Sequence, residues 1–155
     1  GRNFDSLWLD LSKGLGCPIG GVLAGSTDFI EKAWRFKQQI GGAMRQAGIV
    51  AAAGIYALEN HVDRLAVDHE NARAFCREIA QIPGIKLIFD HCPTNLVFFD
   101  VSETGMDAAT VAEKLLAHDV RIGAMGPYRM RAVTHLDINW EQLSEAAEAL
   151  RKVVA

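Results

Sequence analysis

The order of helix-like and strand-like segments after residue 60 most strongly limits the folds that this chain can adopt. Apolar residues recur at helical spacing, with charges on the opposite face, in three segments: 61–79, 107–118 and 139–154. Four short apolar runs that resemble strands lie between them: 85–90, 95–101, 120–124 and 128–134. The resulting order, helix–strand–strand–helix–strand–strand–helix, predicts a small α+β domain with its helices on one face of a largely antiparallel sheet.

The first 60 residues show a different pattern of apolar residues. Two short buried strands are expected at 6–11 and 21–24. A helix begins after Ser26, with Asp28 and Glu31 as an approximate capping box, and is expected to bury its apolar side chains, Phe29, Ile30 and Ala33. A second helix, rich in alanine, follows over 46–58. We therefore predict an α/β chain with two parts, 1–60 and 61–155.

A glycine-rich turn joins the two expected strands of the first part. Residues 12–21 read Ser-Lys-Gly-Leu-Gly-Cys-Pro-Ile-Gly-Gly, so that Lys13 precedes the glycines. A phosphate-binding P-loop requires its lysine after the glycines, and a dinucleotide fingerprint requires glycine where Ile19 stands, so both motifs are excluded. Spacing alone leaves two interpretations of Lys13, a solvated surface side chain or a positioned amine in a loop that carries function.

Three further blocks follow this turn: Gly-Gly-Ala-Met-Arg-Gln-Ala-Gly at 41–48, Ala-Ala-Ala-Gly-Ile-Tyr-Ala-Leu at 51–58, and Arg-Ala-Val-Thr-His-Leu-Asp at 131–137. Together with the lysine turn, and in this order, they resemble the low-specificity L-threonine aldolases. These are enzymes of the aspartate aminotransferase fold type that use pyridoxal 5'-phosphate (PLP). The resemblance covers nearly the whole chain and roughly the C-terminal half of such an enzyme.

The resemblance implies a fold and an activity. Residues 1–60 would be the C-terminal portion of the large PLP-binding domain, and 61–155 the small C-terminal α+β domain. The expected reaction cleaves the Cα–Cβ bond of β-hydroxy-α-amino acids such as threonine or allo-threonine, which yields glycine and an aldehyde. In the family, the N-terminal half supplies the phosphate-binding loop, the ring-stacking histidine and the aspartate at the pyridine nitrogen. The chain is therefore expected to be a fragment that is inactive alone, with its catalytic base in the missing half.

The resemblance also assigns roles to three residues. Lys13 is expected to bind the PLP aldehyde as a Schiff base, and lysine suits this role because its pKa shifts readily. Arg45 would bind the cofactor, at its phosphate or at a subunit boundary, with a structural loop arginine as the alternative. Arg131 would bind the substrate carboxylate, which suits a planar guanidinium. Its alternative role is an internal salt bridge, for example to Asp137, and Arg129 is a rival on the same strand face.

Composition limits the partners and the compartment. A formal charge of −3 and a pI near 5.9 do not indicate the excess of basic residues that nucleic-acid binding requires. No apolar run is long enough to span a membrane. Three cysteines without a C-x-x-C pair argue for a reducing compartment rather than a disulfide framework, and histidine spacing indicates no metal site. We expect a cytoplasmic enzyme with an amino-acid substrate. The family's active sites lie at subunit boundaries, so a homo-oligomer is also expected.

Two alternative functions remain open from the sequence. The first is a PLP-dependent β-eliminating lyase of the same fold type, in which Lys13 keeps its role and a different bond breaks. The second is a non-catalytic module that uses the small domain for assembly. Products separate the two enzymes, and a PLP absorption band that depends on Lys13 separates either enzyme from the module.

Overall fold

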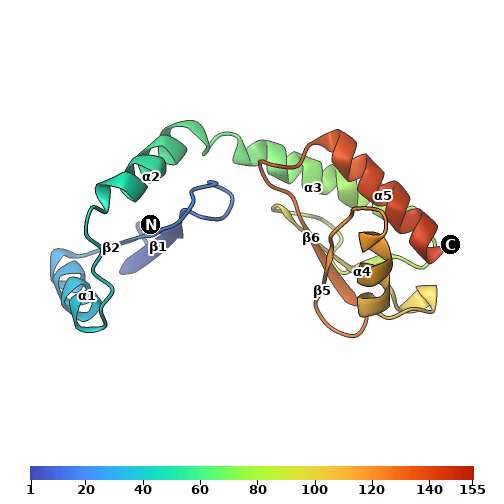
Figure 1. Cartoon of the computed structure of the whole chain (residues 1–155), viewed down its shortest axis with the longest axis horizontal. Coiled ribbons are helices and arrows are strands. Elements are labelled where there is room, and N and C mark those ends of the chain that lie inside the picture. Colours follow the sequence, from blue (N-terminus) through green and yellow to red (C-terminus); the bar gives the residue numbers. More distant parts are fainter. The chain divides into compact units, whose positions relative to one another are not determined.

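The computed structural model describes residues 1–155, which form two compact units, Gly1–Arg64 and Leu65–Ala155 (Figure 1). The sequence predicted a division after residue 60. That the first part is a cofactor-binding domain and the second a separate small domain stays a prediction. No helix of the chain combines the length and the apolar character needed to cross a membrane.

The first unit contains a two-stranded antiparallel sheet and two helices. Strand β1 (Ser6–Asp10) pairs with β2 (Gly21–Gly25), with Trp8 opposite Leu23. Helices α1 (Thr27–Gln39) and α2 (Gly48–Asn60) follow. The two expected strands, joined by the lysine turn, are thus confirmed, and the helices lie close to their expected positions.

Two details of α1 differ from the expectation. The side chain of Ser26 caps the helix by accepting a hydrogen bond from the backbone N–H of Phe29 at 3.3 Å, so the predicted Asp28–Glu31 capping box is wrong. No residue of α1 is buried, and Phe29 is 39% exposed. A two-stranded sheet has too little surface to cover the apolar side of a helix.

The second unit has the predicted order of helices and strands. Its elements are α3 (Leu65–Ile79), β3 (Lys86–Leu87), β4 (Leu96–Asp100), the 3₁₀ turn η1 (Ser102–Thr104), α4 (Ala108–Leu116), β5 (Gly123–Ala124), β6 (Arg129–Val133) and α5 (Trp140–Val154). The sheet order is β3-β4-β6-β5, and every neighbouring pair is antiparallel. This confirms the expected antiparallel sheet.

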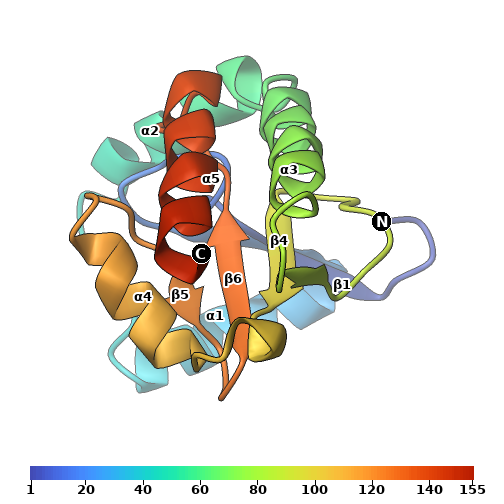
Figure 2. The same cartoon turned by 90° about the vertical axis from the view of Figure 1, so that its right-hand side faces the viewer.

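Alternation along the two central strands explains the layers. In β4 and β6, the residues Val97, Phe99, Met130 and Ala132 are buried, whereas Arg129 and Arg131 between them are exposed. Helices α3, α4 and α5 cover one face of the sheet (Figure 2). The buried strand residues form one core with the inward side chains of these helices: Ala72, Phe75, Ile79, Val111, Leu115, Leu143, Ala147 and Leu150.

Some boundaries and side chains differ from the expectation. The outer strands β3 and β5 have two residues each, because they pair with a neighbour at only two positions. The helical spacing within segments 107–118 and 139–154 predicts that Leu116 and Trp140 face the core, but they are 53% and 39% exposed. Trp140 is the first residue of α5 and Leu116 is the last residue of α4, so each stands at the end of its helix.

A disulfide bond joins Cys76 of α3 to Cys92 in the segment before β4. The expectation that the cysteines form no crosslink is therefore wrong for this pair. The two residues are 16 positions apart in the chain, and the packing of α3 beside β4 brings them together. The third cysteine, Cys17, is buried and free.

Candidate functional site

Backbone hydrogen bonds within the turn that carries Lys13 hold its two ends together. The N–H of Leu11 donates to the Gly20 carbonyl at 3.0 Å, and the N–H of Cys17 donates to the Leu11 carbonyl, also at 3.0 Å. Gly16 and Gly20 have φ angles of 71° and 124°, a region that side chains disfavour. The glycines therefore allow the chain to reverse within a defined loop.

Helix α2 fixes the position of this turn. Leu11, Leu15 and Cys17 are buried. The Cys17 thiol lies 3.5 Å from the Ala53 carbonyl oxygen, and Nδ1 of His61 lies 2.7 Å from the Leu15 carbonyl oxygen. A Cβ atom placed on Gly54 would lie 3.0 Å from Cδ1 of Leu11. A glycine of α2 thus permits the close approach of the turn.

The amine of Lys13 points away from this buried surface. Its side chain is 78% exposed, and Nζ lies 3.9 Å from Oδ2 of Asp10. Asp10 accepts hydrogen bonds from the Ser12 hydroxyl at 2.7 Å and from the Ser12 N–H at 3.0 Å. These bonds, and more weakly the Lys13 charge, hold the pKa of Asp10 below its ordinary value. Lys13 is therefore an accessible amine beside a charged carboxylate.

Arg45 lies in the irregular segment between α1 and α2. Gly41, directly after the C-cap residue of α1, has a φ of 72°, and Gln46, next to Arg45, has a φ of 51°. The Arg45 side chain is exposed and has no ion-pair partner among residues 1–155. Nothing in the first unit occupies its guanidinium, which leaves it available to an anion.

Arg131 lies in the middle of β6, on the sheet face that no helix of this unit covers. It is opposite Phe98 of β4 and Gly123 of β5. The salt bridge to Asp137 that the sequence left open is absent, because Asp137 instead lies 3.4 Å from Nδ1 of His135. Arg131 therefore presents a guanidinium without an internal carboxylate partner.

Arg129, its rival, has a different neighbour. It lies opposite Asp100 of β4. Hydrogen bonds from Ser102 are the main cause that holds the pKa of Asp100 below its ordinary value, and the charges of Lys86 and Arg129 contribute. The carboxylate of Asp100 thus stays charged beside Arg129, and this distinguishes the two arginines.

The structure fixes each predicted site residue within its own unit. Lys13 and Arg45 belong to the first unit, where no hydrogen bond or ion pair joins their side chains, and Arg131 belongs to the second. Their functional roles remain predictions.

The sequence did not predict the hydrogen bonds that join Thr134, the residue after β6, to α3 and to Asn95. The Thr134 side chain is fully buried, and Oγ1 donates to the Asp68 carbonyl of α3 at 2.6 Å. Its backbone N–H donates to the Asn95 carbonyl at 3.0 Å, and Nδ2 of Asn95 donates to the Thr134 carbonyl at 2.8 Å. The only sequence signal was the position of Thr134 within the block at 131–137.

Comparison with known proteins decides the family. The sequence profile described as "Beta-eliminating lyase" matches residues 1–104, which is more than half of the chain. The chain belongs to the beta-eliminating lyase family. Its resemblance to the low-specificity L-threonine aldolases is also confirmed: the Escherichia coli K12 enzyme of that name is 43% identical over 151 residues.

That match covers 97% of this chain and 43% of the E. coli enzyme, so this family member spans less than half the length of its curated relative. Among solved structures, it is similar to an Exiguobacterium protein provisionally named an aromatic amino acid beta-eliminating lyase/threonine aldolase. The TM-score is 0.76 at 21% identity, over 97% of this chain and 45% of the other. A structure of SPT with PLP gives 0.74 at 18% identity, over 97% and 39%. These similarities confirm the expected fold class.

Proposed function

We propose that this chain is part of a PLP-dependent aldolase that cleaves β-hydroxy-α-amino acids of the threonine type into glycine and an aldehyde. The observation that carries the proposal is the Lys13 turn, an exposed amine on a loop that α2 holds in place. The 43% identity to a low-specificity L-threonine aldolase supports the choice of reaction. The chain covers 43% of that enzyme, so the activity is proposed for the full-length protein.

The residues present fit the chemistry of PLP. The cofactor requires an amine that can bind its aldehyde, and Lys13 offers one that is 78% exposed, with one long ion pair to Asp10 at 3.9 Å. It also carries a phosphate, an anion for which the exposed guanidinium of Arg45 is suited. When bound, PLP serves as the electron sink that stabilises a carbanion at the substrate's Cα.

The chain's own residues would hold and orient the reactants. Lys13 would bind the cofactor covalently and release it to the substrate's amino group. Arg131 would bind the substrate carboxylate through two parallel hydrogen bonds, because its guanidinium has no internal partner. A fixed carboxylate restricts rotation about the adjacent Cα, and this selects which bond breaks. We propose that the base for the β-hydroxyl proton lies in the part of the enzyme that precedes this chain.

The first experiment tests the cofactor role. Full-length protein is incubated with PLP, reduced with borohydride, digested and analysed by mass spectrometry. We expect the added mass on the peptide that contains Lys13 and a visible absorption band, both of which Lys13→Ala removes. Lys152→Ala is the matched control, because Lys152 is an exposed lysine on α5. PLP mass on another lysine, or a colourless protein, would refute the proposed role and favour a non-catalytic assembly module.

The family match favours one second candidate, a PLP-dependent β-eliminating lyase. Both reactions use Lys13 and a carboxylate-binding arginine, so the site residues alone do not separate them. Incubation of full-length protein with threonine and with cysteine does. Glycine and acetaldehyde from threonine support the aldolase, whereas pyruvate and ammonia from cysteine, without glycine from threonine, support the eliminating lyase.

We also propose that the full-length enzyme is a cytoplasmic homo-oligomer and that this chain associates with the N-terminal half of the same protein. Apolar side chains that α2 leaves exposed, Ile49, Ile55, Tyr56 and Leu58, support an additional covering surface. Light scattering coupled to size exclusion measures the oligomer of full-length protein, and cell fractionation tests the compartment. A monomer that forms the full PLP site would contradict the oligomer proposal.

A further inference from the structure

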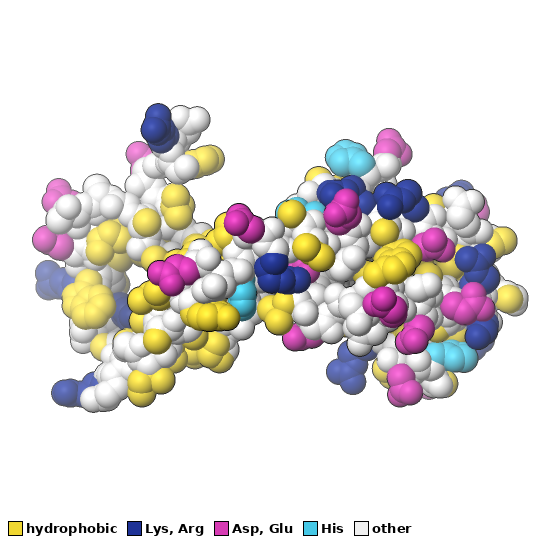
Figure 3. Space-filling view, turned by 90° about the horizontal axis from the view of Figure 1, so that it is seen from above, with side chains coloured by type: hydrophobic (Ala, Val, Ile, Leu, Met, Phe, Trp, Pro, Cys, Tyr) yellow, Lys and Arg dark blue, Asp and Glu magenta, His cyan; other side chains and the backbone are white.

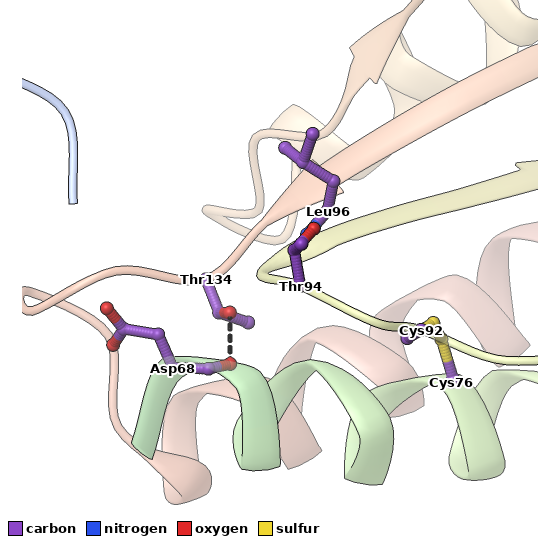
Figure 4. The surroundings of a disulfide bond; sticks show 6 residues. All are labelled: Asp68, Cys76, Cys92, Thr94, Leu96 and Thr134. Atoms are coloured by element: carbon purple, nitrogen blue, oxygen red, sulfur yellow. Dashed lines mark hydrogen bonds between the residues drawn. A yellow bond between two sulfur atoms is a disulfide. The ribbon is translucent and has the colours of Figure 1, made fainter. Parts of the chain in front are cut away.

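The Cys76–Cys92 disulfide forms one wall of a cavity in the second unit. Cys76 is on α3, and Cys92 is in the segment between β3 and β4 (Figure 4). The two residues are 5% and 8% exposed, respectively. Both line a cavity of about 420 Å³. The sulfur pair is thus buried in the fold, yet it borders a space large enough for a small molecule.

Charged side chains from two segments surround the mouth of this cavity. Arg73 and Arg77, one turn apart on α3, contribute guanidinium groups, and His91 and Asp90 flank Cys92. All four side chains are exposed, so the cavity opens at the surface. Neither arginine has an ion-pair partner among residues 1–155. The net positive charge around the cavity favours the binding of an anionic small molecule.

This arrangement suits thiol–disulfide exchange. Exchange begins when a thiolate attacks one sulfur of the bond, and cations beside the sulfurs favour both the approaching and the departing thiolate. Arg73 and Arg77 line the same cavity as Cys76 and Cys92, so their charges border the space through which a thiol would reach the bond. Apolar wall residues, Ala80 and Leu87, leave room for the body of the incoming molecule.

We propose that Cys76–Cys92 is a reversible redox site that exchanges with a small thiol bearing carboxylates. The incoming thiolate attacks one cysteine sulfur, the S–S bond breaks, and the other cysteine leaves as a thiolate that takes up a proton. A second molecule of the thiol attacks the resulting mixed disulfide and releases the second cysteine as a thiol. The protein gains two electrons and two protons, and two small thiols become one small disulfide.

Other contacts hold the two crosslinked segments when the bond is open. Phe75 and Ile79 of α3 are in the core, and Thr134 bonds to the Asp68 carbonyl of the same helix. Asn95, three residues after Cys92, is joined to Thr134 by two hydrogen bonds, one through its backbone carbonyl and one through its side-chain amide. Breaking the disulfide is therefore compatible with the folded state, as a reversible site requires. The proposal is independent of the aldolase activity.

Peptide mapping of the full-length protein tests the proposal. The protein is equilibrated in buffers with graded ratios of reduced to oxidised glutathione, alkylated, and digested with trypsin. Cleavage after lysine and arginine places Cys76 in peptide 74–77 and Cys92 in peptide 87–114. We expect the linked pair of peptides to disappear and reappear reversibly in folded protein, with a glutathione adduct on one cysteine at intermediate ratios. A link that never forms, or that opens only on unfolding, would overturn the proposal.

Two variants test the charge selection. The double variant Arg73→Ala/Arg77→Ala should slow reduction by glutathione about two- to fivefold for each arginine, the effect that exposed ion pairs produce. Reduction by uncharged 2-mercaptoethanol should change little. Arg151→Ala on α5 is the matched control, because Arg151 is an exposed arginine that does not line this cavity. Equal effects on the two thiols would overturn the assignment of a carboxylate-bearing thiol.

Discussion

Arg131 lies directly opposite Phe98 in the ladder of β4 and β6, whereas Arg129, two residues earlier on the same face, lies opposite Asp100. A phenyl ring does not neutralise a guanidinium, so Arg131 keeps its capacity to bind a carboxylate. Arg129 has an anionic neighbour within the sheet. The register of two strands thus separates two arginines that the sequence left as rivals.

Replacement of these arginines by lysine should have unequal effects on the full-length enzyme. Arg131→Lys loses the planar pair of donors, and we expect KM for the amino-acid substrate to rise about ten- to a hundredfold. Arg129→Lys keeps a cation opposite Asp100 and should change KM by less than about twofold. Steady-state kinetics with saturating PLP provides the measurement. Equal effects, or a larger effect at Arg129, would contradict the assignment.

A larger side chain at Gly54 should displace the Lys13 turn through its contact with Leu11. Gly54→Val places atoms against Cδ1 of Leu11, which already lies 3.0 Å from the position of a Cβ. We expect full-length protein with this substitution to retain less PLP after dialysis. Gly48→Ala is the control, because a Cβ there meets nothing within 4 Å and Gly48 is the first residue of the same helix. Unchanged PLP retention by Gly54→Val would show that α2 does not position the turn.

Loss of the Thr134 hydroxyl should weaken the attachment of α3 to β6. Thr134→Val removes the 2.6 Å bond to the Asp68 carbonyl and should lower the opening free energy of α3 by about 1–2 kcal/mol. Thr134→Ser keeps the hydroxyl and should retain most of that bond. Native-state hydrogen exchange of the α3 amides measures the effect. A larger loss in the serine variant than in the valine variant would assign the effect to packing instead.

The Asp107 cap of α4 should make stability depend on acid pH. Its carboxylate accepts a hydrogen bond from the Thr110 N–H at 2.8 Å, and hydrogen bonds from Thr110 hold the pKa of Asp107 below its ordinary value of 3.8. Because the folded pKa is the lower one, the stabilisation is complete above pH 3.8 and is lost as the pH falls through the folded pKa.

Asp107→Asn removes the titration and keeps a capping side chain. The melting temperatures of wild type and this variant should therefore stay a constant distance apart above pH 3.8. Below that pH, the wild type should lose stability relative to the variant. A difference that stays constant down to the lowest measurable pH would contradict the role of this carboxylate.

Local signals in the sequence were sufficient for much of the second unit. The spacing of Asn139 and Gln142 at the start of the segment 139–154 predicts a capping box, and the structure has one, with reciprocal hydrogen bonds of 2.9 Å between each side chain and the other's backbone N–H. Leu143, Ala147 and Leu150 are buried as their helical spacing indicated. Such features depend on residues within one or two turns of each other, which is the range that periodicity describes.

Features that depend on contacts between residues far apart in the chain could not be predicted from local sequence patterns. The disulfide joins residues whose proximity follows from the packing of α3 beside β4, and Thr134 finds its partner 66 residues away along the chain. The unpaired state of Arg131 depends on the register between β4 and β6. The lysine turn itself was predictable because its glycines and flanking strands are local, whereas its attachment to α2 was not.

Exposed apolar side chains on the β1–β2 ribbon affect how the first unit behaves in the laboratory. Trp8 is 67% exposed, and Leu7, Leu9, Val22 and Leu23 are each at least 39% exposed. A two-stranded ribbon of this kind has free edges that recruit other chains, so residues 1–64 produced in isolation should aggregate. Stability changes measured on that segment alone would then report self-association rather than folding, and substitutions around Lys13 are best ranked in longer protein.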